Sequence, residues 1–135
     1  MEYKEYKAKD NVIMDKTMDF SVRIVTMFKY LKYEKKEFDM SRQVLRSGTS
    51  IGANVHEANE AQTKKDFHAK MCIALKEVSE TEYWLILLIK TNFLPIEIGN
   101  SILKDCREIK KILTAIVRTT KMKLVVNKGT KINEK

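Results

Sequence analysis

The sequence of 135 residues has little of what interrupts helices, with one proline and four glycines. Sheet-based folds need a turn about every ten residues, and five Gly and Pro residues are too few to supply those turns. Their scarcity argues against sandwiches and doubly wound sheets and favours long helices. A chain of this length buries roughly two-thirds of its unfolded surface, so we expect one domain without disulfide or metal supports.

Cysteine and histidine are equally scarce. The two cysteines, Cys72 and Cys106, lack the C-x-x-C spacing of redox and zinc sites, and we expect both to be reduced and buried. The two histidines, His56 and His68, lie in no Glu-x-x-His motif, which a di-iron helix bundle requires. The sequence therefore predicts no metal and no cofactor.

One pair of residues raises the alternative of nucleophilic catalysis. His68 and Cys72 are four residues apart, one turn of a predicted helix, and hydrolysis at this pair is conceivable. We favour a coincidental pair, because Cys72 lies beside the predicted core, where a thiolate is disfavoured. Glycine-rich phosphate loops are also missing. We therefore predict a protein that is not an enzyme.

No segment has the apolar length of a membrane span or a signal peptide. The longest apolar run, residues 83–89, ends at Lys90 and is far shorter than the about 20 residues that cross a bilayer. The first ten residues mix Lys and Glu and lack the apolar region of a secretory signal. We expect a cytoplasmic protein with no membrane partner.

Positive charge is concentrated at the C-terminal end. The formal net charge is +8, and residues 118–135 hold six basic residues and one acidic residue, which leaves +3 for the rest. Because residues 1–117 are nearly balanced in charge, the net charge of the whole chain is weak evidence for a nucleic-acid-binding face. A solvated tail explains the excess equally well.

Apolar spacing predicts four helices, over residues 12–34, 40–61, 64–93 and 96–122. Thr63 and Asp66 are spaced to cap the third helix, and Pro95 ends it. Short connections between helices of this length predict an all-α, antiparallel up-down-up-down four-helix bundle over residues 12–122. Residues 1–11 would form an N-terminal arm and residues 123–135 a basic flexible tail. The predicted buried stripe of the first helix is Val12, Met14, Met18, Val22, Val25, Phe28 and Leu31.

The second predicted helix contains an unusual run of small residues over positions 47–54, including Gly48 and Gly52. Each glycine costs about 1 kcal/mol relative to alanine in a helix, so propensity alone favours a loop or a kink. We predict a continuous helix, because the apolar seam stays in phase through the run and small side chains let the following helix approach closely. The seam consists of Val44, Gly48, Ile51, Val55 and Ala58.

A turn near residues 62–63 makes the second and third helices antiparallel, so residues whose numbers add to about 125 should be level. This rule aligns Arg46 with Glu80, Arg42 with Glu82, and Glu57 with His68. The polar stripe beside the seam consists of Arg42, Arg46, Ser50, Asn54 and Glu57. Such a stripe either fixes the register through ion pairs or offers a polar groove to a ligand or a phosphate backbone, and both interpretations stay open.

Three runs, SRQVLRSGTSIGANVHEA at residues 41–58, KKDF at 64–67 and IALKEVSETEYWL at 73–85, closely resemble the four-helix-bundle proteins encoded in intervening sequences of bacterial 23S rRNA. The resemblance implies a left-handed antiparallel bundle that assembles into a homopentamer around a central channel and binds nucleic acid. A related bundle is the accessory protein of diversity-generating retroelements, where it partners a reverse transcriptase.

These observations together predict a non-enzymatic, oligomeric module that binds RNA or DNA through phosphate contacts. The candidate binding residues are Arg42, Arg46, Lys64, Lys65, Lys70, Arg118, Lys121 and Lys123. A single bundle cannot bury every large side chain on the third helix, so the candidate oligomer interface is Phe67, Tyr83, Trp84 and Leu87. The alternative is a protein–protein interaction scaffold, including an accessory subunit of a nucleic-acid enzyme such as a reverse transcriptase.

Overall fold

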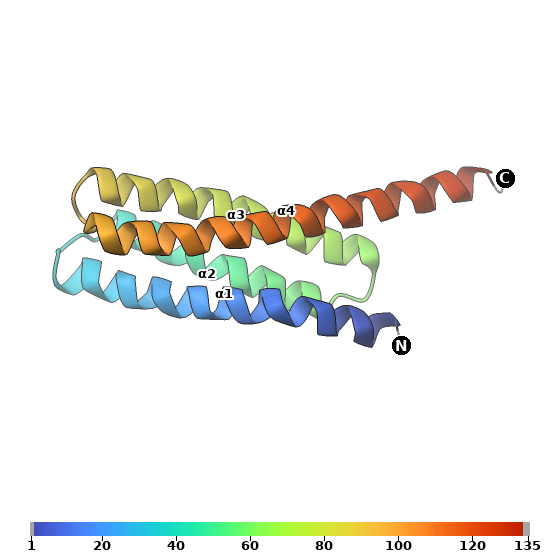
Figure 1. Cartoon of the computed structure of the whole chain (residues 1–135), viewed down its shortest axis with the longest axis horizontal. Helices are drawn as coiled ribbons and strands as arrows, with labels where there is room; N and C mark the ends of the chain where they lie inside the picture. The colour runs from blue at the N-terminus through green and yellow to red at the C-terminus, as the bar shows by residue number, and fades with distance from the viewer. Residues whose placement is uncertain (1, 134–135) are drawn as a thin grey trace.

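The computed structural model describes the backbone of residues 2–133 and the side chains of residues 12–127. Its four helices are α1 (Glu2–Tyr33), α2 (Met40–Asn59), α3 (Lys64–Lys90) and α4 (Ile96–Asn133). Residues 2–133 contain no strand. Figure 1 shows the helices side by side, with the end of α4 running past the turn between α2 and α3. The predicted all-α class and four-helix bundle are confirmed.

Contacts between side chains establish that neighbouring helices are antiparallel. Between α2 and α3, Thr81 donates a hydrogen bond to Ser47 (2.9 Å), and Lys70 pairs with Glu57 (3.1 Å). The later residue of α2 thus meets the earlier residue of α3. The same order joins α3 to α4, through the pairs His68–Thr120 and Glu82–Arg107, and α1 to α4, through the pairs Lys16–Glu108 and Arg23–Asp105.

The glycine-containing run of α2 is helical throughout, as predicted. Its close neighbour, however, is α1 and not the following helix. A Cβ atom on Gly48 would lie 2.9 Å from two carbons of Ile24, and one on Gly52 would lie 3.3 Å from the Thr17 carbonyl oxygen. The two glycines lie on the side of α2 that faces α1, whereas Ser47 faces α3. The missing Cβ atoms therefore let α1 and α2 pack closely.

Most of the buried stripe predicted for α1 is wrong. Val12, Met18, Val22 and Val25 are between 37% and 61% exposed. Leu31 is buried as predicted, and the other buried apolar residues of this helix are Ile13, Phe20, Ile24 and Met27. Both sets have helical spacing, because α1 is apolar on two sides, and periodicity does not say which side meets the neighbouring helices.

The apolar seams of the other helices are buried largely as predicted. In α2 all five seam residues are buried, and in α3 the buried apolar residues are Phe67, Met71, Ala74, Val78, Leu85 and Leu88. The apolar stripe of α4 also has helical spacing, and its core contains Ile102, Cys106, Ile109 and Leu113, whereas Ile98 is exposed. Ile98 lies in the first turn of α4, at the edge of the bundle.

The inner helix ends follow the predicted signals to within a few residues, whereas α1 begins well before, and α4 ends well after, the predicted bounds. The Thr63 hydroxyl accepts a hydrogen bond from the Asp66 amide (3.0 Å) and caps α3 as predicted. Residues 2–11 continue α1, and residues 123–133 continue α4, in the segments expected as an arm and a flexible tail. Met1, Glu134 and Lys135 lie outside the described residues. Within residues 2–133 no helix has an apolar stretch long enough to cross a membrane.

Candidate nucleic-acid interface

The two arginines of α2 differ in their surroundings. Arg46 pairs across the helix interface with Glu77 (3.3 Å) and with Glu80, the partner that the level rule predicts. Its charge is therefore balanced by two carboxylates. Arg42 is exposed and donates a hydrogen bond to the Phe38 carbonyl oxygen (3.2 Å), and Glu82, its expected partner, instead contacts α4.

Lys70 is also held in an ion pair. Its partner is Glu57 of α2, at 3.1 Å, whereas the level rule aligns Glu57 with His68. The observed pair is shifted by two residues, because His68 faces α4, where its Nδ1 atom lies 2.6 Å from the Thr120 hydroxyl. Arg46 and Lys70 thus each join α2 to α3 through ion pairs.

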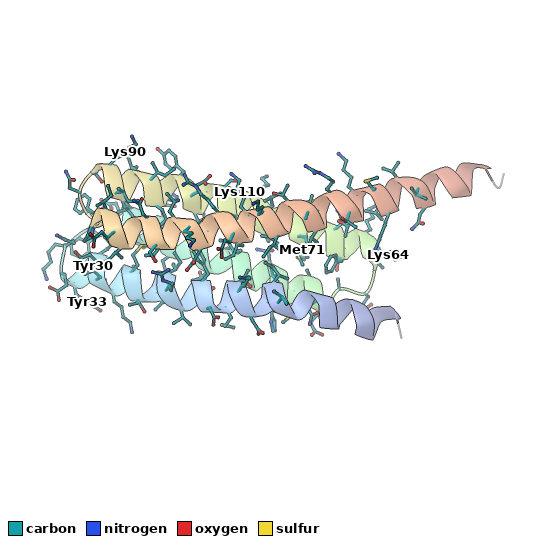
Figure 2. All side chains as sticks on the ribbon, viewed as in Figure 1. Tyr30, Tyr33, Lys64, Met71, Lys90 and Lys110 are labelled. Atoms are coloured by element: carbon teal, nitrogen blue, oxygen red, sulfur yellow. The ribbon has the colours of Figure 1, made fainter. Side chains whose placement is uncertain are left out.

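Four other predicted residues lie near one end of the bundle. Lys64 and Lys65 are exposed in the first turn of α3, and Lys121 and Lys123 are exposed on α4. His68 of α3 contacts Thr120 of α4, and the two helices are antiparallel. Lys64 and Lys65, about one turn before His68, therefore lie near the same height along the bundle as Lys121 and Lys123, which follow Thr120. Figure 2 shows Lys64 near the turn that α4 runs past.

The largest group of cations lies on α4 and contains only one predicted residue, Arg118. We call it the α4 basic face and define it as Lys104, Arg107, Lys110, Lys111 and Arg118. Together with Asn100, Leu103, Glu108, Thr114 and Ala115, these residues line an open hollow of about 840 Å³. Lys110, labelled in Figure 2, lies near its middle.

Carboxylates neutralise only part of the α4 basic face. Lys110 and Arg107 each lie 3.0 Å from Glu82 of α3, and their hydrogen bonds, with that of Lys110 the larger cause, lower the pKa of the Glu82 carboxyl. Glu108 pairs with Lys16 of α1 at 3.9 Å.

Three cations of the face have no such partner. Within residues 12–127, Lys104, Lys111 and Arg118 form no ion pair and are all exposed. They repeat every seven residues, so neighbours lie about 10 Å apart along α4 and nearly on one line. Their spacing was readable in the sequence as a polar line opposite the apolar stripe. Lys104 and Lys111 are not among the predicted binding residues, because that prediction compared the net charge of segments and not the positions of charges around each helix.

The four residues of the predicted oligomer interface differ in how far they are exposed. Phe67 is only 6% exposed and belongs to the core of its own chain, so its assignment to an interface is wrong. Tyr83 is 59% exposed, and its ring meets the edge of Trp84 with 5.1 Å between ring centres. Trp84 donates a hydrogen bond to Glu80 (3.3 Å), and Leu87 is half-buried.

The cysteines and histidines form no metal site. Cys72 lies 3.4 Å from Nε2 of His68, and the other ring nitrogen of His68 contacts Thr120. Cys106 is fully buried, and that burial raises the pKa of its thiol to about 12. Among the described side chains no three His, Cys, Asp or Glu residues converge.

Comparison with known proteins assigns the fold to a family. The sequence model of the 23S rRNA-intervening sequence protein family matches residues 9–115. The chain belongs to this family. A solved structure from Bacteroides thetaiotaomicron, described as a protein of unknown function from the S23 ribosomal protein family, is 55% identical with a TM-score of 0.80. The match covers 82% of this chain and 98% of that one. No curated protein matches the chain.

In this 23S rRNA intervening-sequence protein the shared part ends before α4 does. The family match stops at Ala115, whereas α4 continues to Asn133. Lys104 and Lys111 of the α4 basic face lie inside the match, and Arg118, Lys121 and Lys123 lie beyond it. The C-terminal part of α4 is therefore an addition to the bundle that the family model describes.

Proposed function

We propose that this 23S rRNA intervening-sequence protein is a non-enzymatic, oligomeric module that binds RNA or DNA through phosphate contacts. The observation that carries the proposal is the line of Lys104, Lys111 and Arg118 on α4, exposed and without ion pairs among the described residues. Unpaired cations on a regular helix are available to a polyanion, whereas Arg46 and Lys70 are occupied by carboxylates.

The arrangement suits a contact with the sugar–phosphate backbone and not with bases. The cations repeat about every 10 Å, close to the rise of three nucleotides along one strand of a duplex. Lys121 and Lys123 follow Arg118 along α4, and Lys64 and Lys65 lie at the same end of the bundle. Binding of this kind is indifferent to sequence and weakens steeply with salt, because each phosphate contact releases counterions.

In an oligomer, weak phosphate contacts from several copies act together and raise the affinity for one nucleic acid. The outer side of α3 presents Tyr83, Trp84 and Leu87, and exposed aromatic residues are common anchors of protein interfaces. We propose that this surface joins copies of the chain into a ring, a homopentamer by the family resemblance. Repetition of the α4 basic face around a ring raises affinity through effective concentration.

The proposal is tested by removing the line of cations. We expect the variant Lys104→Gln/Lys111→Gln/Arg118→Gln to bind a duplex RNA at least about tenfold more weakly than the unchanged protein at low salt. The slope of log affinity against log salt concentration should also decrease in magnitude by about 2 to 3, because three phosphate contacts are lost. A fluorescence-anisotropy titration over a range of salt concentrations measures both.

The matched control removes the same charge from other surfaces. Lys29, Lys76 and Lys90 are exposed on α1 and α3, and their joint substitution by glutamine also lowers the net charge by three. We expect this control to bind nearly as tightly as the unchanged protein. Equal loss in both variants would show that total charge and not the α4 basic face governs binding, and an affinity independent of salt would overturn the proposal.

The second candidate function is a scaffold for another protein, including an accessory subunit of a nucleic-acid enzyme such as a reverse transcriptase. Tyr83, 59% exposed beside Trp84, favours it, because such a surface fits a protein partner as well as a second copy. If the unchanged protein binds no polynucleotide at low salt, the scaffold is the remaining interpretation.

A further inference from the structure

Two exposed apolar surfaces take no part in the proposed phosphate contacts, although the first of them also contains the basic residues Arg118, Lys121 and Lys123, which do. The first is the α4 end segment, which we define as residues 118–127, where Met122 and Val125 are 64% and 62% exposed. The second is the α1 outer stripe, which we define as Met18, Val22 and Val25. Exposed apolar side chains repeated along one helix face are characteristic of interaction surfaces.

The α4 end segment presents its apolar residues away from its own bundle. Thr120 is buried and contacts His68 of α3, so this side of α4 faces the bundle. Met122 and Val125 are two and five positions later in the helix, which places both on the opposite side. They are therefore not covered by α3, which agrees with their exposure.

The α1 outer stripe is directed outward in the same way. The buried side of α1 is set by Phe20, Ile24 and Met27. Met18 and Val22 are each two positions from Phe20, on either side of it, and so point to the opposite side of the helix. The stripe spans about 10 Å along α1 from Met18 to Val25, and the α4 end segment spans about 14 Å along α4.

Charges beside the two surfaces are opposite. Asp15 and Asp19 flank the α1 outer stripe, with Lys29 one turn beyond its end, and Arg118 and Lys121 flank the apolar part of the α4 end segment. The two aspartates, Arg118 and Lys121 are exposed, and within residues 12–127 none of these four forms an ion pair. Two copies of either surface would repel each other, whereas one surface against the other brings opposite charges together.

We infer that the α4 end segment of one copy docks on the α1 outer stripe of a second copy. The inference rests on the oligomer proposed above and names a contact within it. Because the two surfaces differ, two copies can exchange them reciprocally in a dimer, or the contact can continue head-to-tail from copy to copy and close into a ring when the rotation permits. The α4 end segment begins beyond the part matched by the family model, so this contact is an addition to whatever the shared bundle forms.

The first test removes the apolar part of the contact. We expect Met122→Gln/Val125→Gln and, separately, Met18→Gln/Val22→Gln to lower the assembly mass measured by light scattering without nucleic acid. Both pairs are exposed, so circular dichroism should show unchanged folding. The matched control, Ile98→Gln in the first turn of α4, exchanges an exposed apolar residue outside both surfaces and outside the outer side of α3, and should keep the mass of the unchanged protein.

The second test exchanges the charges. We expect Asp15→Lys/Asp19→Lys and Arg118→Glu/Lys121→Glu each to dissociate the assembly several-fold more readily on dilution. The variant with all four substitutions should recover, because the complementarity is restored with reversed signs. Failure of this rescue, or an unchanged mass in the apolar variants, would overturn the inference.

The outcomes separate this inference from the proposed function. If the unchanged protein is itself a monomer, the proposed oligomer fails and the docking contact fails with it. If the unchanged protein is oligomeric and its mass resists every substitution in the two surfaces, only the docking contact fails. If Met122→Gln/Val125→Gln weakens polynucleotide binding and leaves the mass unchanged, the α4 end segment contacts nucleic acid and not a second copy.

Discussion

Glu82 is the residue on which the contact between α3 and α4 is centred. Its carboxylate accepts hydrogen bonds from Arg107 and Lys110, each at 3.0 Å, and its side chain is only 19% exposed. These hydrogen bonds favour the charged form and lower the pKa of Glu82. The same carboxylate thus orients two cations of the α4 basic face.

The pH dependence of stability follows from the direction of that pKa shift. A carboxyl with a lowered pKa in the folded state stabilises the fold above its ordinary pKa, and this contribution is lost as the pH falls through the lower value. We expect Glu82→Gln to reduce the free energy of unfolding by about 1 kcal/mol at pH 7. The difference from the unchanged protein should shrink below about pH 4.

Urea unfolding at neutral and acidic pH measures this difference. The control Glu34→Gln replaces an exposed carboxylate at the end of α1 and should change stability little at either pH. A Glu82→Gln difference that persists unchanged in acid would contradict the role given to the Glu82 carboxylate.

At the scale of the helix, the contact between α1 and α2 depends on Gly48. A Cβ atom at this position would lie 2.9 Å from both Cγ atoms of Ile24, which is fully buried and branched at Cβ. Ile24 has little freedom to move away, because its neighbours are closely packed. The glycine is therefore required by packing, although it lowers the intrinsic helix propensity of α2.

We expect Gly48→Ala to lower the free energy of unfolding by about 1 kcal/mol. Overpacking costs about 1 to 3 kcal/mol, and the higher helix propensity of alanine offsets about 1 kcal/mol of that. Chemical denaturation measures the net effect. In an Ile24→Ala background the same substitution should be neutral or stabilising, because the clashing carbons are gone. Additive effects of the two substitutions would refute the packing explanation.

Sequence patterns at this scale predicted some helix faces and not others. The seams of α2 and α3 were predictable because each helix has one dominant apolar side, which Val44, Ile51 and Val78 illustrate. The face of α1 was not, since Val22 and Ile24 belong to two apolar sides and only the neighbours decide between them. The line through Lys104 and Lys111 was readable from helical spacing but not from a count of charges.

At the scale of the whole molecule, the bundle is less closed on one side. Contacts join α1 to α2, α2 to α3 and α3 to α4 extensively, whereas α1 and α4 meet mainly through a few pairs such as Arg23–Asp105. This single chain also leaves Met18, Tyr83 and Met122 more than half exposed. Such surfaces are expected where copies of the chain meet.

The proposed association would contribute to stability in a way that depends on protein concentration. Because assembly requires folded chains, mass action stabilises the folded state at higher protein concentration. We expect the unfolding temperature to rise by several degrees over about a hundredfold increase in protein concentration. Differential scanning calorimetry measures this shift, and the same shift should be smaller for Met122→Gln/Val125→Gln. A midpoint independent of concentration would contradict the oligomer.

Local chemistry along the chain was sufficient to determine the helices and their order. Apolar spacing, the Thr63 cap and the scarcity of Gly and Pro act between residues close in sequence, so they can be read without knowing the fold. Which cations remain available was decided only by the tertiary structure. Arg46 and Lys111 are equally basic in the sequence, but packing brings carboxylates to Arg46 and leaves Lys111 without an ion pair among residues 12–127. Charge becomes a binding surface only where neighbouring helices do not neutralise it.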